Sequence, residues 1–202
     1  MTEHLGFIVT DASPLITLGA ANALTCLTMP GVPVYIPDMV YTEVTQDMAR
    51  LGANEVVQWV RVHSDQVKIV PTQVYADYQA LLALNPNTRS KGRGEQAAAE
   101  VLEYEISADE ELQAVLLYED NDIRRRRFVG ALPDRVTALS TGDFLHELEA
   151  AGFIQSSDHI LDNAAERGRN IEAQRGPQSD DEARALLRDQ LHKRRDTPGM
   201  ER

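Results

Sequence analysis

Short apolar runs alternate with helix signals along the first three-quarters of the chain. The predicted strands cover residues 7–10, 34–37, 67–70, 114–118 and 136–139. The runs are mostly apolar and show no regular alternation of apolar and polar residues, which is typical of parallel strands covered on both faces. Helices are predicted between the strands, and the first of them has Ser13 as its N-cap and Pro14 as its first helical residue. This order predicts an α/β domain around a central parallel sheet.

The composition changes after about Ile154, where large apolar residues become rare. Two amphipathic helices are predicted beyond that point, over 160–171 and 179–195. We therefore divide the 202-residue chain into a core domain, residues 1–154, and a helical, partly flexible C-terminal extension, residues 155–202. A domain of about 150 residues is long enough to bury a single hydrophobic core.

The cysteine content and the N-terminal sequence bear on location. Cys26 is the only cysteine, which excludes an internal disulfide and a cysteine-based zinc site and favours a reducing, cytoplasmic setting. The uncharged stretch between Asp11 and Asp38 contains Pro30 and Pro33, so we expect no membrane-spanning helix there. The first four residues form no basic region ahead of the apolar stretch, and we expect no signal peptide.

Charge is unevenly distributed along the chain. The formal net charge of −12 argues against a protein built to coat nucleic acid, since phosphate binding normally requires positive charge. The bases of the core domain, however, fall mostly into two clusters beside acidic segments. These candidate phosphate contacts are Arg89, Lys91 and Arg93, and then Arg124, Arg125, Arg126 and Arg127.

Acidic residues occur where the predicted strands give way to loops or helices. Asp11 follows the first strand, and the segment 119–122, Glu-Asp-Asn-Asp, follows the strand that begins at Ala114. Glu43 and Glu95 lie in the early turns of two helices. Any one of them could be an ordinary cap or a residue that interacts with the helix dipole. Because the carboxyl ends of parallel strands meet at one edge of the sheet, we expect all of these acids to lie close together.

A cluster of carboxylates requires a counter-charge. Two carboxylates about 4 Å apart repel by roughly 4 kcal/mol at an effective dielectric constant near 20. Oxygen ligands without thiol or histidine partners favour a hard cation such as Mg²⁺ or Mn²⁺. The acids therefore predict metal-assisted hydrolysis of a phosphodiester, in which the ion activates water and offsets the charge of the phosphate.

Five segments of the chain, in order, resemble those of the PIN-domain nucleases. They are Val9–Ile16, Tyr35–Val44, Gly94–Ala98, Leu116–Asp122 and Ser140–Leu145. The resemblance runs from Phe7 to about Ile154. It implies a PIN-like three-layer α/β/α sandwich with a central parallel sheet, to which the C-terminal extension adds a helical appendage.

The resemblance also implies a site and an activity. The acids that it places in the catalytic site are Asp11, Glu43, Glu95, Asp120 and Asp122. Of these, Asp11, Glu95, Asp120 and Asp122 are the expected metal ligands, while Ser13, Glu119 and Thr141 are auxiliary candidates. Which of Glu119, Asp120 and Asp122 contacts the metal stays open. The implied protein is a Mg²⁺- or Mn²⁺-dependent endoribonuclease.

Many small bacterial members of this family are toxins of toxin–antitoxin pairs. The resemblance therefore implies an RNA substrate, an antitoxin partner and a homodimer. The alternative is a non-catalytic PIN-like protein that uses the fold for binding or regulation. A dinucleotide-binding domain is disfavoured, because no glycine-rich turn follows the first strand.

Overall fold

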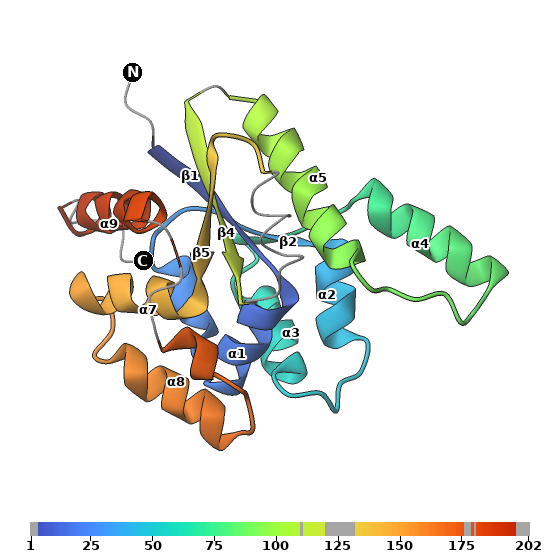
Figure 1. Cartoon of the computed structure of the whole chain (residues 1–202), viewed down its shortest axis with the longest axis horizontal. Helices are drawn as coiled ribbons and strands as arrows, with labels where there is room; N and C mark the ends of the chain where they lie inside the picture. The colour runs from blue at the N-terminus through green and yellow to red at the C-terminus, as the bar shows by residue number, and fades with distance from the viewer. Residues whose placement is uncertain (1–3, 110, 120–131, 176–178, 180, 197–202) are drawn as a thin grey trace.

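Five parallel strands form the centre of the protein in this computed structural model, which describes residues 4–109, 111–119, 132–175, 179 and 181–196. The strands are β1 (His4–Thr10), β2 (Val34–Pro37), β3 (Val67–Val70), β4 (Leu112–Tyr118) and β5 (Val136–Ser140). Their order across the sheet is β3-β2-β1-β4-β5 (Figure 1). The chain thus builds the sheet outward from β1 in one direction and then returns to build it in the other. The reversal places a topological switch point between β1 and β4.

Helices connect these strands and continue beyond the last of them. They are α1 (Ala12–Ala20), α2 (Asp38–Thr45), α3 (Ala53–Val62), α4 (Gln73–Leu84), α5 (Arg93–Ser107), α7 (Thr141–Ala150), α8 (Ser157–Glu166) and α9 (Asp181–Asp196), with short 3₁₀ turns at Leu24–Thr28 and Glu172–Gln174. The helix predicted to begin at Arg124 lies outside the described residues. In the part of the chain that the structure describes, no helix has the length and apolar character that crossing a membrane requires.

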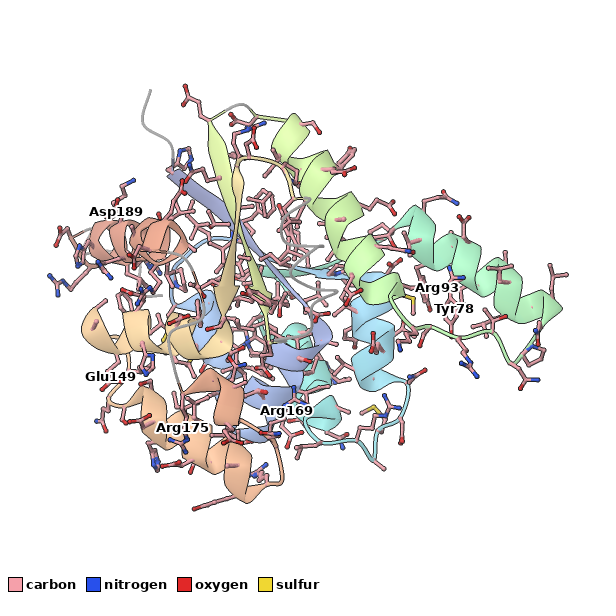
Figure 2. The ribbon with its side chains drawn as sticks, in the orientation of Figure 1. Tyr78, Arg93, Glu149, Arg169, Arg175 and Asp189 are labelled. Carbon is pink, nitrogen blue, oxygen red and sulfur yellow. The ribbon has the colours of Figure 1, made fainter. Side chains whose placement is uncertain are left out.

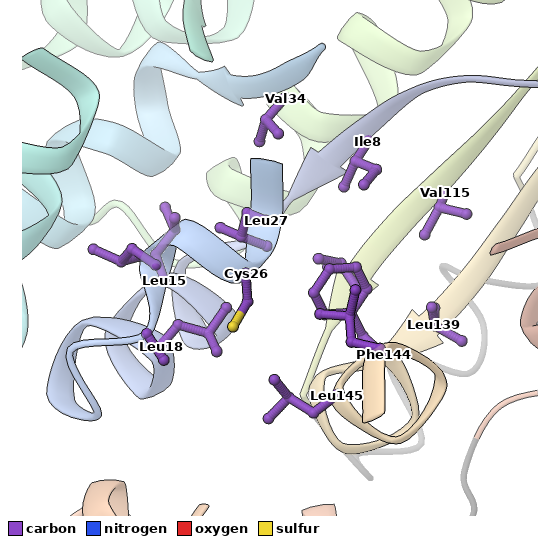
Figure 3. Close-up of a cluster of buried hydrophobic side chains, with 14 of the residues drawn as sticks. Ile8, Leu15, Leu18, Cys26, Leu27, Val34, Val115, Leu139, Phe144 and Leu145 are labelled. Atoms are coloured by element: carbon purple, nitrogen blue, oxygen red, sulfur yellow. The ribbon is translucent and has the colours of Figure 1, made fainter. Parts of the chain in front are cut away.

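Apolar side chains of the central strands pack on both faces of the sheet. On β1, Ile8 belongs to one hydrophobic cluster, while Phe7 and Val9 belong to another. The first cluster includes Leu15 of α1 and Phe144 of α7 (Figure 3). The second includes Ala98, Val101 and Leu102 of α5. Because successive side chains of a strand point to opposite faces, the two clusters are two layers of core. The predicted α/β/α sandwich is confirmed.

The start of α1 differs from the sequence-based prediction. Asp11 is the N-cap of this helix, so Ser13 and Pro14 lie in its first turn. Proline is tolerated there because the first N–H groups of a helix have no intrahelical partner. The helix also ends at Ala20, short of the predicted Leu27. Asn22 adopts a left-handed conformation with φ of 55°, which stops the helix because asparagine tolerates this region better than most residues.

The C-terminal extension contributes to the first hydrophobic cluster. Leu161 of α8 and Ala183, Leu187 and Leu191 of α9 are buried in the same cluster as Ile8. Helix α9 packs against α7, β1 and β5. Hydrogen bonds join the same regions, since the N–H of Ser140 donates to the hydroxyl of Ser179 at 2.7 Å. The proposed boundary at residue 154 stays a prediction, but apolar side chains on both sides of it share one core.

Candidate active site

Asp11 lies at the switch point between β1 and β4. It directly follows β1, its side chain is mostly buried, and as the N-cap of α1 it has φ of −80° and ψ of 172°. Its N–H donates to the carbonyl of Leu117 at 3.0 Å, which ties it to the end of β4. The extended backbone at Asp11 turns the chain from strand into helix. The fold thus holds this carboxylate at the edge of the sheet where α/β proteins bind ligands.

Glu43 approaches Asp11 across the first turn of α5. A Cβ atom built on Gly94 would lie 3.2 Å from Oε2 of Glu43 and 3.9 Å from Oδ1 of Asp11. The two carboxylates, carried by α2 and by the start of α1, therefore converge on one point. Glycine at position 94 leaves that point open, because a larger side chain would fill the space between the two acids and α5.

Glu95 comes next in α5, in the first turn of that helix. Its Oε2 atom lies 3.8 Å from the position that a Cβ of Gly92 would take, and Gly92 is the N-cap of the helix. Gly92 has φ of 79°, a conformation that glycine adopts without strain. The carboxylate of Glu95 thus turns back toward the start of its own helix, as a glutamate at the third helical position commonly does.

The remaining two predicted ligands, Asp120 and Asp122, lie outside the described residues, as do Arg124, Arg125, Arg126 and Arg127. Within the ranges that the structure describes, no three His, Cys, Asp or Glu side chains are close enough together to hold a metal ion. The two carboxylates that do converge, Asp11 and Glu43, offer oxygen atoms beside an open glycine. This donor type fits a hard divalent cation, and further carboxylates are needed to complete its coordination.

Glu119 forms an ion pair with an arginine of the C-terminal extension. Its side chain is 2% exposed, and its Oε2 accepts hydrogen bonds from the hydroxyl of Thr17 at 2.8 Å and from Nη2 of Arg169 at 2.9 Å. The Nε of Arg169 in turn donates to the hydroxyl of Thr17 at 2.7 Å. Arg169 was not among the residues singled out from the sequence. Nothing local marks it among the arginines of the extension, since its partners lie 50 or more residues away.

The other two auxiliary candidates lie at the same edge of the sheet. The carbonyl of Ser13 accepts a hydrogen bond from Nη2 of Arg169 at 3.3 Å. Thr141 opens α7 directly after β5 and is fully buried, and its hydroxyl has no hydrogen-bond partner among the described residues. A Cβ built on the next residue, Gly142, would lie only 2.0 Å from the carbonyl oxygen of Gln174. The extension therefore covers the start of α7.

The first basic cluster lies just before Glu95 in the chain. Arg89 and Lys91 are exposed on the loop before α5, and Arg93 is the first residue of that helix. The guanidinium of Arg93 lies 5.3 Å from the centre of the Tyr78 ring on α4 (Figure 2), a cation–π distance. These basic residues immediately precede Gly94 and Glu95 in the chain, and the guanidinium of Arg93 is directed to α4.

Comparison with known families matches the N-terminal part of the chain. Residues 7–85 match a family model described as a PIN domain. The matched segment contains Asp11 and Glu43, the two acids that converge, and ends at Asn85, before α5. The chain matches no curated protein.

Proposed function

Residues 7–85 identify this chain as a PIN-domain protein, and from that premise we propose that it is a metal-dependent endoribonuclease. The observation that carries the proposal is the convergence of Asp11 and Glu43 on Gly94, at the switch point of a parallel sheet. The proposed ligands of a Mg²⁺ or Mn²⁺ ion are Asp11, Glu95, Asp120 and Asp122. Glu43 completes the acidic site from α2.

The proposed chemistry requires the acidic side chains, a bound metal ion and the basic side chains of the site. A bound divalent cation supplies Lewis acidity and lowers the pKa of water that it binds. Asp11 and Glu43 provide negative charge at a fixed place, because one caps a helix tied to β4 and the other lies on a helix packed against α5. Arg89, Lys91 and Arg93 are exposed or half-buried at and just before the start of α5, and they hold RNA phosphates by charge. We propose the same role for Arg124, Arg125, Arg126 and Arg127.

The biological setting is proposed from the family resemblance. The protein is a cytoplasmic toxin that a partner antitoxin neutralises, and it acts as a homodimer. Expression of the wild-type chain then arrests growth, and Glu95→Gln relieves the arrest.

One observation favours the alternative of a non-catalytic PIN-like protein. The carboxylate of Glu95 lies beside the N-cap of its own helix, where a purely structural glutamate would also lie. A non-catalytic protein binds RNA or a protein partner without cleaving either. The two functions therefore differ in one measurable property, the appearance of metal-dependent cleavage products.

The test compares the wild-type protein with Asp11→Asn in RNA cleavage with Mn²⁺, with Mg²⁺ and with a chelator. Asp11→Asn keeps the size of the side chain and removes its charge. We expect it to lose at least about 100-fold in rate, because even indirect partners of metal sites cost 10–100-fold when they are replaced. The matched control is Asp47→Asn, which removes an exposed acid that forms an ion pair with Arg50 at 3.9 Å. It should cleave as the wild type does.

Each outcome separates the two functions. Cleavage by the wild type that a chelator abolishes and Asp11→Asn lacks supports the nuclease. Equal cleavage by wild type and Asp11→Asn contradicts the proposed site. RNA binding without cleavage at any metal concentration favours the non-catalytic protein.

A further inference from the structure

Helix α4 exposes an apolar side that carries almost no charge. Charged residues make up 26% of the chain, yet Asp77 is the only one among the 12 residues of α4. Leu84 is 84% exposed and Leu81 is 42% exposed. Their spacing from three exposed alanines places all five side chains on one side of the helix. We call this set the α4 face: Ala76, Ala80, Leu81, Ala83 and Leu84.

The α4 face points away from the rest of the molecule. Helix α4 projects from the body of the protein (Figure 1) and packs mainly against α5 and α2. Tyr78 is the one buried residue of α4, and it clusters with Met39 of α2 and Ala97 of α5. Because Tyr78 holds the inner side of the helix against the protein, the α4 face is left on the outer side, in solvent.

Helix α4 is held in place at its N-terminus. Thr72, the N-cap, donates its hydroxyl to Oδ1 of Asp38 at 2.7 Å and its N–H to Oδ2 at 3.0 Å. The N–H groups of Gln73 and Val74 donate to the carboxylate of Glu100 at 2.6 and 3.1 Å. A helix fixed in this way loses little further freedom when its outer side is covered, so a partner meets a surface that is already ordered.

The charges beside α4 differ between its two ends. Asp77 is exposed in the first half of the helix. At the other end, the hydroxyl of Thr88 donates to the carbonyls of Leu81 at 3.3 Å and Asn85 at 2.7 Å, which keeps the following loop against the last turn. Arg89 comes next in that loop and is exposed. The helix thus has an exposed acid toward its start and an exposed base beside its end.

We propose that the α4 face binds the α4 face of a second copy of this chain. Two copies that each carry a net charge of −12 repel one another, and a surface with few acids is where they approach at least cost. The charges beside α4 suit an antiparallel pair about a twofold axis near Ala80. In that pair Leu84 of each copy packs on Ala76 of the other, and Asp77 of each lies beside Arg89 of the other. A guanidinium has five N–H donors, so Arg89 can contact this acid and an RNA phosphate together.

The size of the α4 face indicates a weak dimer. A helix of 12 residues is about 18 Å long. A pair of such helices buries less than the roughly 800 Å² per partner of a standard interface. We therefore expect a dissociation constant of about 10–100 μM and a monomer at lower concentrations. The inference rests on the homodimer that the proposed function includes, and it does not depend on metal-dependent cleavage.

The test is sedimentation equilibrium of the whole chain, without metal or RNA, from about 1 to 500 μM. Leu84→Glu should raise the dissociation constant at least about 100-fold, because the twofold axis places two substituted side chains in each dimer and each buried leucine is worth about tenfold or more. The matched control is Val62→Glu, at an apolar residue of α3 that is 73% exposed. It should leave the dissociation constant unchanged. Both replaced side chains are exposed in the monomer, so urea unfolding of either variant at about 1 μM should match that of the wild type.

A charge reversal tests the antiparallel arrangement. Asp77→Arg places like charges together at both ends of the pair and should raise the dissociation constant about fivefold or more. Adding Arg89→Asp in the same chain restores opposite charges at both ends, and the dissociation constant should return toward that of the wild type. A double variant that associates no better than Asp77→Arg alone overturns the antiparallel pair.

The outcomes for the inference and for the proposed nuclease are distinct. A wild type that stays monomeric at about 500 μM overturns the inference, and the α4 face is then left to a different protein partner. A dimer that Leu84→Glu weakens no more than Val62→Glu does overturns it equally. RNA cleavage with Mn²⁺ is measured on the same preparations. A dimer that cleaves no RNA contradicts the nuclease and leaves the inference standing, while a monomer that cleaves RNA contradicts the inference alone.

Discussion

Leu187→Ala tests whether the C-terminal extension is part of the core. Leu187 lies on α9, is fully buried, and belongs to the same hydrophobic cluster as Ile8 and Phe144. The substitution removes three buried carbon atoms, which at about 0.8 kcal/mol each amounts to about 2.4 kcal/mol of transfer free energy. The cavity that remains raises the cost, and we expect the free energy of unfolding to fall by about 3 kcal/mol.

The assay is equilibrium unfolding in urea of the whole chain. With an m-value of about 2 kcal/mol per M, the midpoint should fall by about 1.5 M. The matched control is Leu84→Ala on α4, where the leucine is 84% exposed and the change should be within about 0.5 kcal/mol. A midpoint for Leu187→Ala that equals that of Leu84→Ala would refute the reasoning. The extension would then be a separable appendage, as its polar composition alone suggests.

Two further predictions concern single titratable groups. Burial raises the pKa of the Cys26 thiol to about 11, so a thiol reagent at pH 8 should label the protein only after urea is added; rapid labelling of the folded protein contradicts this. The Ser157 hydroxyl and N–H lower the pKa of Glu149 (Figure 2). The unfolded chain therefore binds a proton at Glu149 more tightly than the folded protein does. The free energy of unfolding of the wild type should exceed that of Glu149→Gln by a constant amount above about pH 4.3, and this difference should shrink as the pH falls further. A difference that is the same at pH 7 and at pH 3 contradicts this.

The strands were predictable because short apolar runs leave a strong local signal, even in the edge strand β3, where Lys68 and Ile69 are exposed. β2 and β3 coincide with the runs at 34–37 and 67–70. β1 begins three residues before its predicted start, because backbone pairing of His4 with Leu112 needs no apolar side chain. The end of α1 depends on the backbone conformation of Asn22, and no pattern of hydrophobic residues encodes that conformation.

The candidate site was predictable only where strand ends place residues together. Oxygen atoms of Asp11 and Glu43 both approach Gly94, and each of these acids follows a strand of the parallel sheet. The partner of Glu119 was not predictable in the same way. Arg169 reaches it from another helix turn, 50 residues further along, and one arginine of nine basic residues in the extension carries no distinguishing mark. Contacts between side chains this far apart in the sequence are determined by how the helices and strands pack in the folded protein.

The contact between α9 and β1 has a consequence for biosynthesis. The strand at the centre of the sheet, β1, leaves the ribosome before α9, and Leu187 and Leu191, which help to cover it, are made nearly 180 residues later. Until they emerge, the apolar face around Ile8 is exposed to solvent and to other nascent chains. A chain that acts on RNA would also emerge among RNA. Late closure of the core therefore delays a folded site until α9 has been made, and it makes the nascent chain a candidate client for chaperones.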